Sequence, residues 1–262
     1  MSPHTIYALL AIVFGMMVGS FLNVCICRIP KDESVVTPPS HCPQCSCLIK
    51  WYDNIPIFSY LLLRGKCRGC NTPISLQYPL VEFLNGILTL FLFLRFGPTP
   101  DFAALFLFCS ALVVITFIDI EYQIIPDEIS LSGILIGFAL SFLLNGHGWL
   151  DSLFGIMLGG GSLYLVACGY QLLTGKEGMG CGDIKLLAMM GAFLGWKAVP
   201  FIIFSSSLIG SFVGVSIMLL QKKDAKLAIP FGPYLSFGAL LYIFYGQPLI
   251  LWYLNFGGFH KG

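Results

Sequence analysis

The sequence predicts an all-α, polytopic membrane protein, and three observations support this fold class. Of the 262 residues, 57% are hydrophobic and only 10% are charged, whereas a soluble domain carries about 25% charged residues. The apolar residues gather in long stretches with short connections between them. Only one connection, residues 27–79, is long enough to fold by itself. We therefore expect about eight transmembrane helices and one extramembrane loop.

Eight stretches are candidate spans, for which roughly 17–25 residues are needed. The first has no Lys or Arg before it and is longer than the apolar core of a signal peptide, so we interpret it as a retained span. The second, fourth and sixth are short, and their boundaries are loose. In chain order the spans cover residues 5–26, 80–94, 102–118, 131–144, 150–173, 184–196, 199–220 and 230–251.

The basic residues orient the chain, because cytoplasmic loops carry an excess of Lys and Arg. Eight spans place both termini on one side of the membrane, together with Arg95, Lys197 and Lys261. The other side, expected to be the cytoplasm, holds eleven basic residues: Arg28, Lys31, Lys50, Arg64, Lys66, Arg68, Lys176, Lys185, Lys222, Lys223 and Lys226. We expect both termini outside, the 27–79 loop in the cytoplasm and, with a net charge of +1, no nucleic-acid partner.

The 27–79 loop carries two Cys-x-x-Cys pairs, Cys42 with Cys45 and Cys67 with Cys70. Two such turns can present four thiolates to one tetrahedral zinc ion. Disulfides are disfavoured, because the cytoplasm keeps thiols reduced. The alternatives are a redox pair or four unligated thiols. We expect structural zinc, since four thiolates leave no open coordination position for chemistry.

Carboxylates at membrane depth are costly and are therefore candidates for function. Asp119 lies in "FIDIEYQIIPDEIS" and Asp183 in "GMGCGDIKLLAMMGAFLGW", and counting spans puts both at cytoplasmic helix ends. Two apposed carboxylates share one proton, so one can activate water while the other polarises a carbonyl. Gly180 and Gly182 could let an extended peptide approach beside Asp183. The alternative is a helix cap or interface anchor, a role that Asp127 fits well.

The sequence lacks the patterns of two other common functional motifs. The four histidines include no His-Glu-x-x-His pattern, and "GYQLLTGKE" lacks the spacing and the hydroxyl of a phosphate-binding loop. These absences argue against the common zinc-protease helix and against nucleotide binding. The run Gly159-Gly160-Gly161 is expected to permit close helix packing.

Four segments in order resemble the type IV prepilin peptidases, bifunctional leader peptidases and N-methyltransferases of the GxGD aspartyl protease group. The resemblance covers nearly the whole chain. The segments are "GSFLNVCICRIP", "CPQCSCLIKWYDNIPIFSYLLLRGKCRGCNTPISLQYPLVE", "IDIEYQIIPDEIS" and "GMGCGDIKLLAMMGAFLGW".

The resemblance implies that Asp119 and Asp183 are catalytic. It implies cleavage of a basic leader from prepilins and pseudopilins, after a glycine, on the cytoplasmic side of the inner membrane, for a type IV pilus or a secretion system. It also implies methylation of the new N-terminal residue with S-adenosylmethionine as donor. Gly65, Lys66 and Glu82 are candidates for the methyl-transfer site. Their alternatives are a turn, a phosphate contact and a buried-charge anchor.

The chain then divides into a first transmembrane helix (1–26), a cytoplasmic zinc-binding loop (27–79) and a transmembrane aspartyl protease domain (80–262). Two rival interpretations stay open. A presenilin-like protease pairs a Tyr-Asp motif with the glycine motif, whereas Ile118 precedes Asp119 here. A non-enzymatic channel or scaffold with a zinc-knuckle binding loop would use the same carboxylates for transport or binding.

Overall fold

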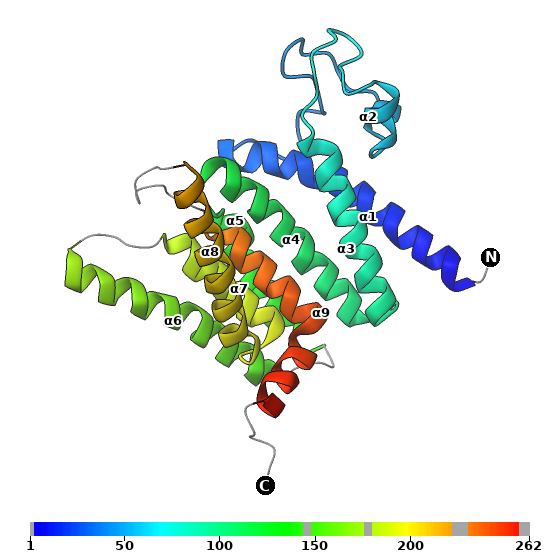
Figure 1. Ribbon diagram of the computed structural model, residues 1–262. Coiled ribbons are helices and arrows are strands. Elements are labelled where there is room, and N and C mark those ends of the chain that lie inside the picture. Colours follow the sequence, from blue (N-terminus) through cyan, green and yellow to red (C-terminus); the bar gives the residue numbers. More distant parts are fainter. Residues whose placement is uncertain (1–2, 144–147, 176–179, 222–229, 257–262) are drawn as a thin grey trace. The chain divides into compact units, whose positions relative to one another are not determined.

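The computed structural model describes residues 3–143, 148–175, 180–221 and 230–256 (Figure 1). The chain forms two compact units, Met1–Ile118 and Asp119–Gly262. Each of the eight expected spans is a helix, and six of these helices are long and apolar enough to cross a membrane. The prediction of an all-α polytopic membrane protein is confirmed. Five of the basic residues used to orient it lie outside the described residues: Lys176, Lys222, Lys223, Lys226 and Lys261.

In the first unit, helices α1 (Pro3–Arg28) and α3 (Gln77–Phe96) pack closely because glycines of α1 leave no side chain at their interface. Gly15 and Gly19 are four residues apart on one helix face, the small-xxx-small pattern of membrane helix pairs. A Cβ on Gly19 would lie 2.7 Å from Cα of Glu82. Asn85 Nδ2 donates to the Gly15 carbonyl at 2.7 Å, and Ser110 Oγ donates to Asn85 Oδ1 at 3.1 Å. This unit also contains α4 (Pro100–Tyr122) as far as Ile118.

The long connection between α1 and α3 carries only short helical turns. They are the 3-10 turns η1 (Ile29–Lys31) and η2 (Trp51–Asn54) and the helix α2 (Phe58–Leu62). Figure 1 shows this loop beyond the C-terminal end of α1 and the N-terminal end of α3. The rest of the loop is held by turn hydrogen bonds around its cysteines.

The second unit is built around one short helix, α7 (Cys181–Leu194), whose residues from Leu186 to Phe193 are all buried. Helix α6 (Trp149–Thr174) runs antiparallel to it, with Ser152 Oγ donating to the Ala192 carbonyl at 2.8 Å. The other helices of this unit are α5 (Asp127–Leu140), α8 (Ala198–Gln221) and α9 (Gly232–Phe256).

The glycines of α6 explain why its backbone approaches α7 so closely. A Cβ on Gly159 would lie 2.5 Å from the Leu187 carbonyl oxygen, and one on Gly155 would overlap the Gly191 carbonyl. The expected packing role of the glycine run is therefore confirmed at Gly159. At Gly161 an added Cβ would meet nothing within 4 Å.

Helix α5 lies parallel to α7, and both helices begin at the same end of the unit. A Cβ on Gly137 would lie 2.7 Å from the Phe193 ring, and one on Gly133 would overlap the Met189 sulfur. Each of these helices has only 14 residues, so each rises about 21 Å. They are the two expected spans that fall short of a full crossing.

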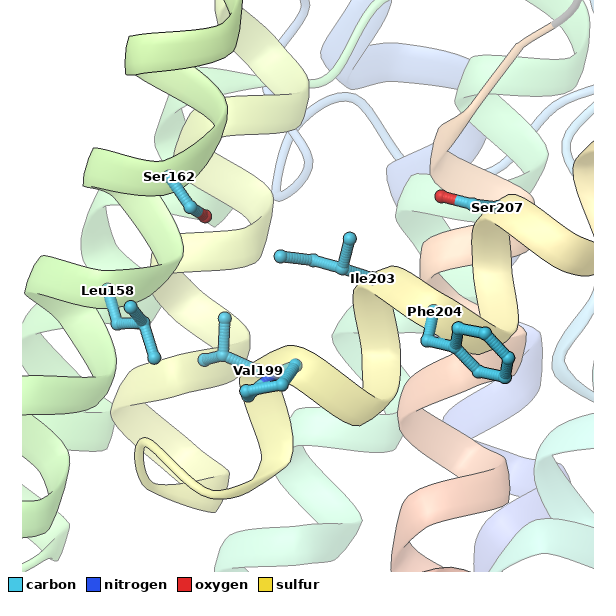
Figure 2. A pocket seen from close by; sticks show the side chains of 7 residues that line it. Leu158, Ser162, Val199, Ile203, Phe204 and Ser207 are labelled. Carbon is cyan, nitrogen blue, oxygen red and sulfur yellow. The ribbon is translucent and has the colours of Figure 1, made fainter.

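A hollow of about 450 Å³ lies between α6 and α8 (Figure 2). Its lining is apolar except for two serines and contains no acid, base or thiol, so it offers a packing surface and no group for catalysis. The labelled residues are Leu158, Ser162, Val199, Ile203, Phe204 and Ser207.

Candidate functional site

The two carboxylates singled out by sequence line one cavity in the second unit. Asp119 lies in the last turn of α4 and is 5% exposed, whereas Asp183 lies in the first turn of α7 and is half-buried. The cavity has a volume of about 250 Å³, and both carboxylates are among its lining residues. The other lining residues are Gln123, Ile124, Ile125, Asp127, Gly180 and Gly182.

After the end of α4 the chain turns and forms one wall of this cavity. Gln123 adopts φ 56°, the left-handed conformation that commonly ends a helix, and its N–H donates to the Asp119 carbonyl at 2.9 Å. The chain reverses through Ile124 and Ile125 and enters α5 after Pro126. Because this turn follows directly, the side chain of Asp119 faces the same space as the first turn of α7.

A backbone donor from a third helix reaches Asp119. The N–H of Gly232, the first residue of α9, donates to Asp119 Oδ2 at 2.9 Å, and this contact is buried. A Cβ on Gly232 would lie only 2.7 Å from the same oxygen. The close approach therefore requires a residue without a side chain.

The two glycines before Asp183 have different surroundings. Gly180 is exposed, lies just before α7 with φ −69° and ψ 139°, and an added Cβ would meet no atom closer than 4.0 Å. Gly182 is already helical, and an added Cβ would lie 2.9 Å from Cβ of Ile125. Neither glycine has a positive φ angle. Gly182 is therefore needed for packing against the cavity wall, while the space beside Gly180 is open.

The expectation that Asp127 caps a helix is wrong. The N-cap position of α5 is occupied by Pro126, and no side chain caps it. Asp127 instead accepts two hydrogen bonds from Lys185 Nζ, at 2.7 and 2.8 Å. Since Lys185 lies on α7, this ion pair ties the first turns of α5 and α7 together at the cavity.

Four cysteines in the first unit form a cluster that can hold a metal ion. The sulfurs of Cys42, Cys45, Cys67 and Cys70 all lie within 4.8 Å of one another. The Sγ atoms of Cys42 and Cys70 are 3.8 Å apart, and those of Cys45 and Cys67 are 4.0 Å apart. A tetrahedral four-thiolate zinc site with Zn–S bonds of about 2.3 Å has S···S edges of about 3.8 Å. The donor set and its spacing therefore fit zinc.

The cluster is made by one hairpin that occurs twice. In the first copy Ser46 N–H donates to the Cys42 carbonyl at 2.9 Å, and in the second Asn71 N–H donates to the Cys67 carbonyl at 3.0 Å. Ser46 and Asn71 both have left-handed φ angles, 56° and 59°. Each short turn thus aims two sulfurs at one point, as the Cys-x-x-Cys spacing predicts.

The side chain of Thr72 forms a hydrogen bond with one of the four cysteines. Its hydroxyl lies 3.1 Å from Cys70 Sγ, and the hydrogen bonds from Thr72, together with those from Cys45 and Cys67, lower the pKa of Cys70 to about 6. A lowered pKa favours the thiolate, which is the form that binds metal.

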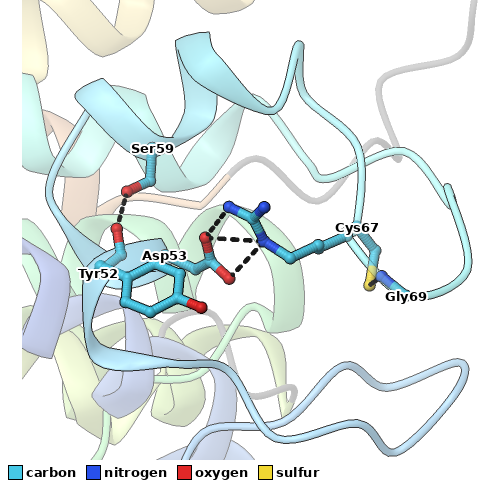
Figure 3. Close-up of polar contacts among 6 residues, drawn as sticks. Tyr52, Asp53, Ser59, Cys67 and Gly69 are labelled. Carbon is cyan, nitrogen blue, oxygen red and sulfur yellow. Dashed lines mark hydrogen bonds and ion pairs between the residues drawn. The ribbon is translucent and has the colours of Figure 1, made fainter.

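An arginine between the last two cysteines ties this hairpin to η2 (Figure 3). Arg68 Nε donates to Asp53 Oδ2 at 2.9 Å, and Arg68 Nη2 donates to Oδ1 at 2.5 Å. These hydrogen bonds hold the pKa of Asp53 below its usual value. Ser59 of α2 donates in turn to the Tyr52 carbonyl at 2.7 Å. The cysteine cluster, η2 and α2 are therefore joined into one folded loop.

The three candidates for methyl transfer lie at the two ends of α2. Glu82 of α3 is 7% exposed and accepts the N–H of Ile57, the residue just before α2, at 2.7 Å. Ile57 has φ 61° and ψ −47°, an unfavourable conformation for a β-branched residue. Beyond the other end, Gly65 takes φ 67° in a turn, and the exposed Lys66 pairs through its backbone with Pro73.

The chain is similar to known proteins over almost all of its length. Residues 13–96 match the Bacterial Peptidase A24 N-terminal domain, and residues 106–215 match the Type IV leader peptidase family. A prepilin leader peptidase/N-methyltransferase of Aeromonas hydrophila is 40% identical over 275 residues, covering 95% of this chain and 94% of that protein. Those of Pseudomonas aeruginosa and Xanthomonas campestris pv. campestris are 37% and 38% identical, covering 97% and 93% of this chain and 95% and 93% of those proteins.

The chain belongs to the type IV leader peptidase family. No solved structure matches it. The four cysteines and Glu82 fall within the matched N-terminal domain, and both cavity carboxylates fall within the second match. The matched family is not the presenilin-like one considered as an alternative.

Sequence reasoning missed two contributors to the cavity. Lys185 was used only to orient the chain, although a lysine two residues after a candidate catalytic carboxylate is itself a charge at the membrane edge. Gly232 was passed over within the last span. The Gly-Pro pair in "IPFGPYLSFG" is a signal for the start of a helix, because Pro is favoured at the first helical position, but it does not indicate which group the Gly232 N–H meets.

Proposed function

We propose that this protein is a membrane aspartyl endopeptidase that removes the leader from type IV prepilins and pseudopilins and then N-methylates the new N-terminal residue. The observation that carries the peptidase assignment is the shared cavity of Asp119 and Asp183. The names of the similar proteins support the substrate and the second activity.

Peptide cleavage needs only groups that line the cavity. One carboxylate, in its ionised form, takes a proton from water as the water oxygen bonds to the scissile carbonyl carbon. The other carboxyl gives its proton to the carbonyl oxygen. A cavity of about 250 Å³ accepts a water molecule and a short extended segment, not a folded domain. We propose that the leader passes the open space beside Gly180, with Gly182 helping to shape the adjoining wall.

We propose that the cysteine cluster holds one zinc ion with a structural role. Cys42, Cys45, Cys67 and Cys70 would bind it, and the ion would supply folding energy to the loop. Four thiolates leave zinc no open position, so no step of either reaction is assigned to it. In this proposal residues 27–79 act as a metal-binding unit between the first helix (1–26) and the protease domain (80–262).

We propose that methyl transfer takes place beside this loop, with S-adenosylmethionine as donor. When bound, S-adenosylmethionine supplies the methyl group from a cationic sulfonium. Glu82 is a buried carboxylate that pairs with no Lys or Arg among the described residues. Such a group suits a cation, so Glu82 would bind the positively charged end of a substrate. Gly65 and Lys66 would shape the far end of α2.

We propose that both reactions occur at the cytoplasmic face of the inner membrane, with the two termini outside. The excess of basic residues on that side supports this orientation. Pilus assembly or protein secretion would then receive the processed product.

The experiment is incubation of the purified protein in lipid with a prepilin and S-adenosylmethionine, followed by mass spectrometry. We expect loss of the leader and addition of one methyl group to the mature N-terminus. A matched substrate with leucine in place of the glycine before the cleavage site should remain intact. A well-folded preparation that leaves the prepilin uncut would contradict the peptidase assignment.

The Glu82→Gln variant tests the methyl-transfer site separately. It keeps the hydrogen bond from Ile57 and removes the negative charge. We expect normal leader cleavage with a loss of methylation on the order of 100-fold, since a charge-assisted contact to a cation disappears. Normal methylation by this variant would remove Glu82 from the proposal.

A further inference from the structure

The carboxylate of Asp119 is held differently from that of Asp183. Asp119 Oδ2 accepts the N–H of Gly232 at 2.9 Å in a buried contact. Among the described residues, this is the one hydrogen bond to the Asp119 carboxylate, and the Asp183 carboxylate receives none. The two members of the pair are therefore chemically unequal before any substrate binds.

The donor belongs to a helix N-terminus. Gly232 begins a helix of 25 residues, and its N–H is one of the groups that have no partner within that helix. Such an N–H favours an anion. Asp183 also lies in the first turn of a helix, so the helix dipole alone does not separate the two. The direct N–H contact does, because a hydrogen bond to a carboxylate is short-range and specific to one oxygen.

Gly232 can approach Asp119 this closely because it has no side chain. An added Cβ on Gly232 would lie 2.7 Å from Asp119 Oδ2 and 3.3 Å from Cγ. Any other residue would move the carboxylate, the helix or both. Pro233 follows at once and fixes the backbone of the first turn of α9.

From these observations we infer that Gly232 is a positioning residue that keeps Asp119 as the ionised member of the pair, and that Asp183 carries the shared proton. This inference rests on the proposed peptidase function for its catalytic meaning. Asp119 is then the base and Asp183 the acid of the first step.

The step balances with one water molecule. Asp119 takes a proton from water, the water oxygen bonds to the carbonyl carbon, and Asp183 gives its proton to the carbonyl oxygen. The resulting gem-diol returns a proton from one hydroxyl to Asp183. The C–N bond then breaks, and the proton held by Asp119 goes to the leaving nitrogen. The pair ends in its starting state, and the products are a carboxylic acid and an amine.

The kinetic test compares Gly232→Ala with Gly232→Pro. Alanine keeps the N–H and adds a Cβ, whereas proline adds a ring and removes the donor. We expect Gly232→Ala to lower kcat for a prepilin peptide about 10-fold, with KM changed less than about 2-fold, because a small misplacement of a reacting group is costly. Gly232→Pro should lower kcat by about a further 10-fold, since the hydrogen bond to a charged group is lost.

Gly238→Ala is the matched control. It lies on the same helix, where an added Cβ would lie 2.8 Å from Ser205 Oγ, so it is similarly crowded but far along α9 from Asp119. It should keep the wild-type kcat. Methylation of a precleaved peptide should stay normal in all three variants. Equal losses in Gly238→Ala and Gly232→Ala, or a Gly232→Pro no worse than Gly232→Ala, would overturn the inference.

Infrared spectroscopy tests the proton's location without any cleavage. At neutral pH, the band of a buried protonated carboxyl should persist in Asp119→Asn and disappear in Asp183→Asn. The reverse pattern would overturn the inference even if the glycine variants do not fold. The predicted band pattern in a protein that cuts no prepilin would instead leave the inference standing and reject the proposed function.

Discussion

The cysteine cluster of the first unit and the carboxylate cavity of the second are assembled in opposite ways. The cluster joins Cys42 to Cys70, 28 positions apart, through two hairpins that each make their own backbone hydrogen bonds. The cavity joins Asp119 to Gly232, 113 positions apart, and takes Asp183 from a third helix. One centre is made by residues close together in the chain, and the other by residues far apart in the chain.

This difference predicts how each centre fails. With zinc bound as proposed, the loss of one cysteine should cost the surrounding loop its metal and its fold together. A carboxylate lost from the cavity removes chemistry from a framework that helix packing maintains. The variants below test that contrast, from the largest expected effect to the smallest.

The first prediction concerns the carboxylates. Asp119→Asn and Asp183→Asn should each lower leader cleavage on the order of 10⁴-fold or more, as for other catalytic constellations. The double variant should be no worse than either single one, because members of one catalytic unit act together. Methylation of a precleaved peptide and metal content should stay normal. A well-folded single variant that still cleaves efficiently would show that the pair is not catalytic.

The second prediction concerns the cluster. Cys67→Ser should lower the metal content from one ion per chain towards zero and expose the loop to protease, since metal binding is coupled to folding. Methylation should fall with it, and cleavage should fall less. Elemental analysis and limited proteolysis measure both effects. Cys47→Ser, outside the four-sulfur cluster, is the control and should keep its metal. A wild-type protein purified without chelators and found free of metal would refute the site.

The third prediction separates the two glycines of the cavity. Gly182→Ala should lower kcat for cleavage about 100-fold, because its Cβ would press on Ile125 and shift the wall beside Asp183. Adding Ile125→Ala should recover most of the rate. Gly180→Ala, in open space, should leave the framework unchanged and act only on the binding of the leader, raising KM more than it lowers kcat. If Ile125→Ala gives no rescue, the loss at Gly182 has another cause than this contact.

The fourth prediction concerns the ion pair between Lys185 and Asp127. Both side chains are partly exposed, 32% and 54%, and such pairs contribute about 1 kcal/mol or less. Lys185→Met should therefore slow cleavage by no more than about 5-fold. Exchanging the two residues, Lys185→Asp with Asp127→Lys, should restore the rate, and high salt should shrink the difference. Loss of cleavage in Asp127→Asn equal to that in Asp119→Asn would contradict the minor role of this ion pair and would make the assignment of the first carboxylate to Asp119 wrong or incomplete.

The same contrast explains what could be predicted from sequence. The eight helices follow from apolar length, and the cysteine cluster follows from spacing, because both are local properties. The pairing of Asp119 with Asp183 was available from span counting, and the shared cavity agrees with it.

The features that could not be predicted from the sequence depend on contacts between helices that are far apart in the chain. Nothing near Gly232 in the chain indicates that its N–H meets Asp119. Asp127 was interpreted as a cap because acidic residues favour helix starts, but Lys185 on a neighbouring helix holds its carboxylate. In the second unit, the sequence indicates close helix packing at the run that begins with Gly159. The close approach of Gly155 to Gly191 could be found only from the packed structure.

The brevity of α5 and α7 has a consequence for the surrounding lipid. At 14 residues each, they rise about 21 Å, against a hydrocarbon core about 30 Å thick. They lie side by side and both begin at the cavity, so their shortfall is not spread around the second unit. Hydrophobic mismatch of this kind is relieved by local thinning of the bilayer. Acyl chain length should therefore affect the proposed peptidase cavity, so that vesicles of longer-chain lipids slow cleavage and leave methylation unchanged.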